Sequence, residues 1–186
     1  MSFPELLLLA FGVSMDAFSV AICKGLAVQD VKPRQATIVG AYFGGFQILM
    51  PLLGFFLGTF IAGFIQAIDH WVIFGILGYL GVEMIREALH PEACPTGDFD
   101  ARTMLPLAIA TSIDAFAVGI AFAMMQVHLA VALGMIGLCT FAFSFLGVYI
   151  GHFFGERWQK PAGIVGGAIL IGIGVRVLVT HLMQNL

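Results

Sequence analysis

The stretch Ser14-Met15-Asp16-Ala17-Phe18-Ser19-Val20 places an aspartate near the middle of a long apolar segment. A closely similar stretch, Ser112-Ile113-Asp114-Ala115-Phe116-Ala117-Val118, places a second aspartate in the same way in the other half of the chain. A carboxylate at mid-bilayer depth costs on the order of a few kcal/mol unless it is paired, solvated or protonated. Because this costly motif occurs twice, the sequence indicates a duplicated membrane protein that handles a cation.

The composition is that of a membrane protein. Of the 186 residues 60% are hydrophobic and only 10% are charged, whereas a soluble domain carries about 25% charged residues. The mean hydropathy is +1.02. Apolar stretches of roughly 20 residues or more, about the length that spans a bilayer, lie at 3–24, 36–65, 70–89, 104–124, 129–154 and 161–182. These stretches predict an all-α membrane protein with six transmembrane helices and no soluble domain.

The first stretch could be mistaken for a signal peptide. It has no basic segment before it and no clear small-residue cleavage site, and Asp16 interrupts its apolar run. These features are not those of a cleaved signal. We therefore expect residues 3–24 to form a membrane span.

The orientation follows from the lysines and arginines in the loops, which attract a loop to the cytoplasmic side. Seven of the eight basic residues flank or lie in the connections between spans 1 and 2, 3 and 4, and 5 and 6: Lys24, Lys32, Arg34, Arg86, Arg102, Arg157 and Lys160. The eighth, Arg176, lies within the last span. We therefore expect a multi-pass protein of the bacterial cytoplasmic membrane with both termini outside the cytoplasm.

The cysteines and the acidic loop give weaker signals. Cys23, Cys94 and Cys139 are scattered and form no C-x-x-C pair, so neither a disulfide framework nor a thiolate zinc site is predicted. The segment 90–100 carries acidic, histidine and cysteine residues that could collect a metal ion. A solvated acidic loop is the favoured interpretation.

The chain contains an internal repeat. Asp16 and Asp114 lie 98 residues apart, and the later spans match at an offset of 93 residues. The matching groups are Leu53-Gly54 and Gly58 with Leu146-Gly147 and Gly151, and Gly81-Val82-Glu83 with Gly174-Val175-Arg176. The repeat predicts a first three-helix unit at 1–90, a cytoplasmic loop at 91–103 and a second unit at 104–186.

Three spans are an odd number, so the second copy must cross the membrane in the opposite direction. Inverted repeats are a common plan of transporters, whose substrate site lies near the midplane where the copies meet. At about 1.5 Å per residue, both aspartates fall within roughly 4 Å of the centre of their spans. Asp16 and Asp114 could therefore share one ion, although the repeat could also be only a way to build a bundle.

Spans 2 and 5 carry matching stripes of small and polar residues on one helix face. Gln47 and Thr140 occupy the middle of these stripes and can offer oxygens, so they join Asp16 and Asp114 as expected metal ligands. Further candidates near the site are Ser19, Thr111, Glu83 and Ser144. We expect structural roles, mostly in close helix packing, for Pro51, Gly44, Gly54, Gly58, Gly137, Gly147, Gly151 and Arg176.

Pro51 and the pair Glu83 and Arg176 leave alternatives open. Pro51 removes the hydrogen bond to the carbonyl of Gln47, and the freed oxygen could bind a metal ion or simply be satisfied by a neighbouring hydroxyl. Glu83 and Arg176 are repeat partners of opposite charge, but their mirrored depths separate them by roughly 10 Å. Each could instead serve a separate gate or reach its own interface.

The ligand chemistry favours a hard divalent cation. Carboxylate, amide, hydroxyl and carbonyl oxygens suit Mn²⁺, Mg²⁺ or Ca²⁺, and two carboxylates balance one such ion. A proton could restore the balance when the ion leaves, which suggests proton exchange. Two alternatives are an exporter of an organic cation or amino acid, and an intramembrane aspartyl protease using the two aspartates as acid and base.

The motifs resemble those of the MntP-type manganese efflux pumps, in the superfamily of lysine-exporter-like transporters. The resemblance covers essentially the whole chain and rests on the two Asp-Ala-Phe motifs, the Lys24-Gly25 exit from span 1 and the Gly174-Val175-Arg176 segment. It implies a transporter rather than an enzyme, with Mn²⁺ as transported substrate, no permanently bound cofactor, no nucleic-acid partner, and ion binding by Asp16 and Asp114. Many members carry a glutamate where this chain has Gln47, a departure that changes the expected charge of the site.

Overall fold

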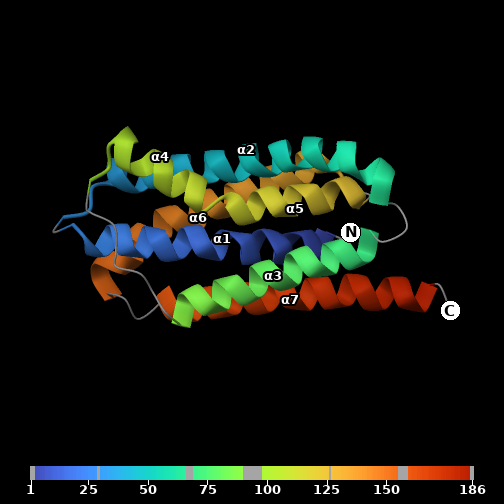
Figure 1. The fold of residues 1–186 in the computed structure, drawn as a ribbon. Coiled ribbons are helices and arrows are strands. Elements are labelled where there is room, and N and C mark those ends of the chain that lie inside the picture. The colour runs from blue at the N-terminus through green and yellow to red at the C-terminus, as the bar shows by residue number, and fades with distance from the viewer. Residues whose placement is uncertain are drawn as a thin grey trace.

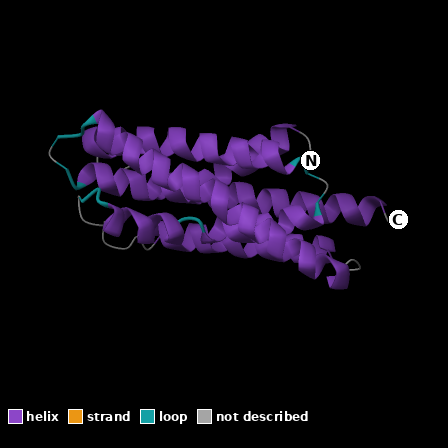
Figure 2. Cartoon of the chain, turned by 90° about the horizontal axis from the view of Figure 1, so that it is seen from above, coloured by secondary structure: helices purple, strands orange, loops and turns teal. Residues whose placement is uncertain are grey.

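The computed structural model describes residues 3–28, 30–65, 69–89, 98–125, 127–154 and 159–184. Every regular element in these ranges is a helix (Figure 2). In chain order the helices are α1 (Phe3–Leu26), α2 (Pro33–Ile65), α3 (Asp69–Leu89), α4 (Ala101–Ala110), α5 (Ile113–Met124), α6 (Leu129–Phe154) and α7 (Gln159–Gln184). The ends of α1, α2, α3, α6 and α7 fall within three residues of the predicted spans.

Three helices are long and apolar enough to cross a membrane: α1, the Pro33–Phe60 part of α2, and α6. The pair α4 and α5 is bent by 43° and gives a fourth span if the two helices cross together. In the described part of α7 the apolar stretch is the shorter Ile164–Thr180. The structure therefore shows an all-helical protein with three to four clear membrane-spanning candidates.

The helices form one elongated bundle (Figure 1). The most extensive packing joins α1 to α6, α3 to α7, α2 to α5 and α6, and α1 to α7. The beginning of α1 and the end of α7 lie at one end of the bundle, which we call the terminal end (Figure 1). The end of α1 and the start of α2, the end of α3 and the start of α4, and the end of α6 and the start of α7 lie at the other end of the bundle (Figure 1). We call it the basic end because Lys24, Lys32, Arg34, Arg86 and Arg102 lie at or near these helix ends.

The fourth predicted span, 104–124, is broken rather than continuous. The helix α4 ends at Ala110, the chain turns at Thr111 and Ser112, and α5 begins at Ile113. Both hydroxyls compete with the backbone here, since Thr111 Oγ1 donates to Leu107 O at 3.0 Å and Ser112 Oγ donates to Ala108 O. Such local side-chain bonds offer the backbone an alternative to the regular helix, and the expectation of one unbroken helix was wrong.

The start of α4 is fixed by a capping residue. The Asp100 carboxylate accepts a hydrogen bond from the backbone N–H of Thr103 at 3.2 Å. Capping satisfies one of the N–H groups that lack a partner at a helix start. Hydrogen bonding by Thr103 also holds the pKa of the exposed Asp100 carboxyl below its usual range.

A buried lysine lies in the last turn of α1, at the basic end. Lys24 has no exposed surface, and its Nζ donates to Asp98 O at 2.7 Å and lies 5.5 Å from the centre of the Phe99 ring. Lys24 flanks the connection between α1 and α2, as the sequence predicted, and it also ties the end of α1 to the segment that leads into α4.

The cysteines differ from expectation in one respect. Cys23 takes part in a disulfide bond, whose partner lies outside the described residues, although the sequence predicted no disulfide. Spacing alone could not predict the bond, because it depends on which segments the fold brings together. Cys139 is a free thiol, and most of the acidic segment 90–100 lies outside the described residues.

Candidate ion site in the helix bundle

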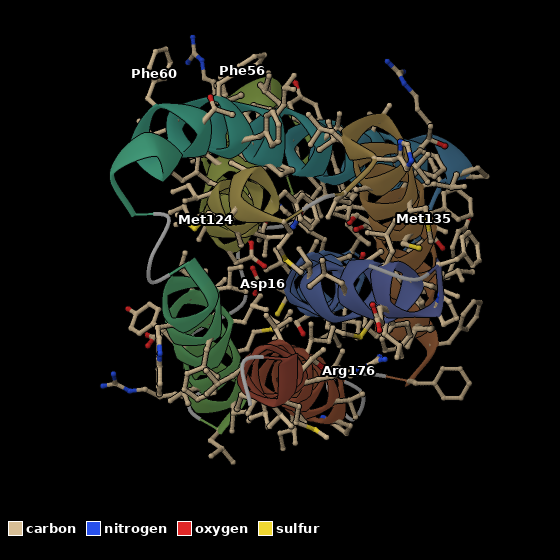
Figure 3. All side chains as sticks on the ribbon, turned by 90° about the vertical axis from the view of Figure 1, so that its right-hand side faces the viewer. Asp16, Phe56, Phe60, Met124, Met135 and Arg176 are labelled. Carbon is tan, nitrogen blue, oxygen red and sulfur yellow. The ribbon has the colours of Figure 1, made fainter. Side chains whose placement is uncertain are left out.

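The two aspartates occupy different kinds of helix position. Asp16 is half-buried within the continuous helix α1, and it lies inside the bundle, near α3 and α5 (Figure 3). Asp114 belongs to the first turn of α5, directly after the break, and both of its carboxylate oxygens are buried. The free N–H groups and the dipole at the start of a helix stabilise a negative charge, so the break gives Asp114 a support that Asp16 does not receive from its own helix.

Gln47 and Thr140 each contact the aspartate motif of the other half of the chain. The side-chain Nε2 of Gln47 on α2 donates to the backbone O of Thr111 at 2.9 Å. The hydroxyl of Thr140 on α6 shares a buried 2.9 Å hydrogen bond with the hydroxyl of Ser14 on α1. The two polar stripes therefore lie directly against the two motifs.

Two buried oxygens have no hydrogen-bond partner among the described residues: Oε1 of Gln47 and Oγ of Ser144. Both side chains are fully buried. A buried polar atom without a partner loses its bonds to water and usually costs about 1–3 kcal/mol. Such atoms therefore mark a place where a ligand or an ion can be received.

The other predicted site residues are less closely tied together. Ser19 is half-buried and donates to Met15 O in its own helix at 2.9 Å. Thr111 forms the break, and Glu83 is half-buried on α3. No group of three or more His, Cys, Asp or Glu residues able to hold a metal ion occurs within the described ranges, so any ion site here must use other oxygens beside the carboxylates.

The glycines of α2 and α6 allow very close helix contacts with the same two motifs. A Cβ atom placed on Gly54 would lie 2.0 Å from Phe116 O, two residues after Asp114. A Cβ on Gly151 would lie 2.0 Å from Ile22 O, six residues after Asp16. Backbone atoms cannot yield as a flexible side chain can, so only glycine fits at these two positions.

The remaining glycines of the stripes show the same close approach. A Cβ on Gly58 would lie 2.7 Å from the Ala123 Cβ, and one on Gly147 would lie 2.9 Å from Phe18 Cδ2. Gly44 and Gly137 bring α2 and α6 together, since a Cβ on Gly44 would lie 2.9 Å from Gly137 O. Pro51 lies within the continuous helix α2, and its carbonyl oxygen would be 2.1 Å from a Cβ on Gly119 of α5.

These contacts set the relative height of the two aspartates along the bundle. Asp16 lies beside the α6 segment between Thr140 and Gly147, whereas Asp114 lies beside the α2 segment between Gln47 and Gly54. Gly44 of α2 packs on Phe141 of α6, which fixes how α2 and α6 are aligned along the bundle. This alignment places Asp16 roughly two helical turns, about 10 Å, closer to the basic end than Asp114. The Cα–Cβ bonds of a helix tilt toward its start, and α1 and α5 run in opposite directions (Figure 1), so the Cα–Cβ bonds of Asp16 and Asp114 tilt toward each other's level in the bundle.

Arg176 forms a contact that the sequence did not predict. Its Nη1 lies 2.5 Å from Oε1 of Glu5 at the start of α1, and the Arg176 and Glu5 side chains are 64% and 19% exposed. By sequence, Glu83 is the repeat partner of Arg176, but the mirrored depths of the two residues differ by roughly 10 Å. Glu5 was missed because only the packing of α1 on α7 brings it to Arg176, and no spacing signal in the sequence marks the pair.

The long apolar helices are those of a multi-pass membrane protein. The family described as "Putative manganese efflux pump" matches residues 30–178, and the chain belongs to this family. It is therefore a transporter and not an enzyme, which removes the aspartyl protease alternative.

Individual relatives match over nearly the whole chain. A protein of Acetivibrio thermocellus named "Putative manganese efflux pump MntP" is 50% identical over 186 residues, covering 98% of this chain and 93% of its own length. Proteins of the same name from Desulfitobacterium hafniense and Campylobacter jejuni are 50% and 45% identical, covering 96% and 98% of this chain and 95% and 98% of their own lengths. No solved structure matches the chain.

Proposed function

We propose that this protein exports Mn²⁺ from the cytoplasm across the bacterial cytoplasmic membrane, through an ion site between Asp16 and Asp114. The observation that supports the proposal is that the polar side chains of Gln47 and Thr140 pack against the motifs of Asp114 and Asp16. In addition, Gln47 Oε1 and Ser144 Oγ are buried without a hydrogen-bond partner among the described residues. The names of the relatives supply the metal and the direction of transport.

The ligand set suits this ion. Manganese(II) prefers carboxylate, carbonyl and water oxygens over thiolates, and the proposed ligands are Asp16, Asp114, Oε1 of Gln47 and Oγ of Ser144. The Thr140 hydroxyl shares its hydrogen bond with Ser14, so Thr140 orients the site in this conformation and becomes a ligand only if that bond opens. The ion is the transported substrate.

The empty site needs a way to neutralise its charge inside the membrane. We propose that a proton binds one of the two carboxylates when the metal ion leaves, which couples export of Mn²⁺ to import of protons. Vesicles loaded with Mn²⁺ and given an imposed pH gradient test this step. Transport that ignores the gradient would rule the coupling out.

We also propose that the architecture is an inverted repeat of six spans, with units at 1–90 and 104–186 joined by the cytoplasmic loop 91–103. The swapped glycine contacts support this arrangement: α2 of the first unit packs on the motif of the second, and α6 of the second unit packs on the motif of the first. The basic end then faces the cytoplasm, in line with the lysines and arginines at that end, and both termini lie outside.

The test of function uses a bacterial strain that lacks its own manganese exporter. Expression of the wild-type chain is expected to lower cellular manganese and restore growth in high Mn²⁺. The variants Asp16→Asn and Asp114→Asn are each expected to lose at least about tenfold of the export activity, a loss of ~1.4 kcal/mol or more in transition-state stabilisation.

The matched control is Asp30→Asn, which removes a carboxylate from an exposed position between α1 and α2 and should export normally. Equal membrane levels of all variants are checked by immunoblot. Unchanged cellular manganese with the wild-type chain would contradict Mn²⁺ export, and protection against an excess of a cationic amino acid would then favour the organic-cation alternative.

A further inference from the structure

In an inverted repeat, the interface between the first helix of one unit and the last helix of the other unit occurs twice. The two copies of this interface differ in this structure. In the first copy α1 packs against α7 from the level of Asp16 to the terminal end. A Cβ on Gly166 of α7 would lie 2.6 Å from the Met15 Cβ, one on Gly12 would lie 3.2 Å from Ile169 Cγ2, and the Glu5–Arg176 ion pair closes the far end. This side of the bundle is sealed between the aspartates and the terminal end.

The equivalent interface in the second copy joins α4 and α5 to α3. Here α5 packs on α3 and α4 packs on α2, whereas any contact between α4 and α3 among the described residues is marginal. Figure 1 shows α3 rising toward α5 at the terminal end and diverging from α4 toward the basic end. The repeat equivalents of Glu5 and Arg176 are Thr103 and Glu83, and within the described residues no hydrogen bond or ion pair joins these two.

We infer that the Glu5–Arg176 pair is the outer gate of the transporter, and that the structure is the conformation in which the ion site faces the basic end. In the opposite conformation α4 closes on α3, α1 separates from α7, and the ion pair breaks. This inference rests on the proposed inverted-repeat transport function and adds to it the residues that close the outer side.

The chemistry of the pair suits a gate that opens in every cycle. An ion pair with a largely exposed arginine contributes little to stability, so it can break and re-form without trapping the protein. While closed, it also neutralises two charges near the membrane boundary that would otherwise be costly there.

The first experiment cross-links positions 5 and 176, the two positions of the proposed gate. In the variant Glu5→Cys with Arg176→Cys, a cleavable bis-methanethiosulfonate linker is expected to reduce Mn²⁺ export at least tenfold, and dithiothreitol is expected to restore it. The single variant Glu5→Cys treated with the same linker is the control and should keep its activity. Full export by the linked protein would overturn the gate.

The second experiment needs no manganese. The variant Thr103→Cys with Glu83→Cys places a thiol pair at the equivalent interface, and the same linker should join it poorly in membranes. Adding Glu5→Gln should raise the yield severalfold, because the outer gate is weakened and α4 closes on α3 more often. Exchanging the charges in full, with Glu5→Arg and Arg176→Glu, should return the yield to its low value.

The outcomes separate the gate from the transport function. An unchanged linking yield after Glu5→Gln would overturn the assignment of the Glu5–Arg176 pair as a gate, whatever the substrate is. A raised linking yield together with absent Mn²⁺ export would support the assignment of the gate and contradict Mn²⁺ as the transported substrate.

Discussion

At the scale of single residues, the polar groups around the aspartates divide into two kinds. The hydroxyls of Ser14 and Thr140 satisfy each other, so they fix the geometry of the ion-free protein. The oxygens Gln47 Oε1 and Ser144 Oγ have no hydrogen-bond partner among the described residues, so they remain available to bind an ion that the ion-free protein lacks. Substitutions in the two groups should therefore affect stability and ion binding in opposite ways.

The contrast is testable with Ser144→Ala and Thr140→Val. Ser144→Ala removes an unbonded buried hydroxyl and should leave the ion-free stability unchanged or raised by about 1 kcal/mol, while weakening Mn²⁺ binding severalfold. Thr140→Val removes one partner of a buried hydrogen bond and should lower the ion-free stability by about 1 kcal/mol. Thermal unfolding in detergent with and without Mn²⁺ measures both effects. A loss of ion-free stability in Ser144→Ala would show that its hydroxyl is already bonded.

At the scale of elements, backbone contact between helices positions the motifs. The glycines of α2 and α6 meet the backbone that follows each aspartate, so the depth of both carboxylates depends on these contacts. Gly45, on the same helix α2, has no atom within 4 Å of its Cβ position. The two glycines should therefore respond differently to the same substitution.

We expect Gly54→Ala to destabilise the protein by about 1–3 kcal/mol, the usual range for overpacking, because its methyl group would collide with Phe116 O and push α2 from α5. Gly45→Ala should be neutral or slightly stabilising, since alanine favours a helix over glycine. Unfolding midpoints of the two purified variants compare them directly. Equal midpoints would mean that the α2–α5 contact is looser than the structure shows.

The helix elements also show how far the sequence predicts the fold. Hydropathy placed five helices within three residues of their ends, because a long apolar run has no stable alternative to a helix in lipid. The break at Thr111 and Ser112 escaped prediction because hydropathy continues across it. Ser14 makes the same bond to the carbonyl four residues back, Ser14 Oγ to Ala10 O at 2.6 Å, yet α1 stays regular, so the local motif alone does not decide between bent and straight.

At the scale of the whole molecule, the sequence predicted candidate site residues but not the contacts that join distant segments. By the repeat offset Gln47 corresponds to Thr140 and Gly54 to Gly147, and each of these four residues contacts the aspartate motif of the other half of the chain. The contacts of Glu5 with Arg176 and of Lys24 with Asp98 depend on how distant segments pack. Charge type and spacing carry no information on such packing.

The central claim is that one ion is shared by two carboxylates from opposite halves of the chain. Its most direct test is the number of Mn²⁺ ions bound per chain by the purified protein, measured by equilibrium dialysis with metal analysis for the wild type, Asp16→Asn and Asp114→Asn. The account predicts one ion per chain for the wild type and a loss of that ion in both variants. Two ions in the wild type, with one retained in each variant, would show two separate sites and contradict the shared site.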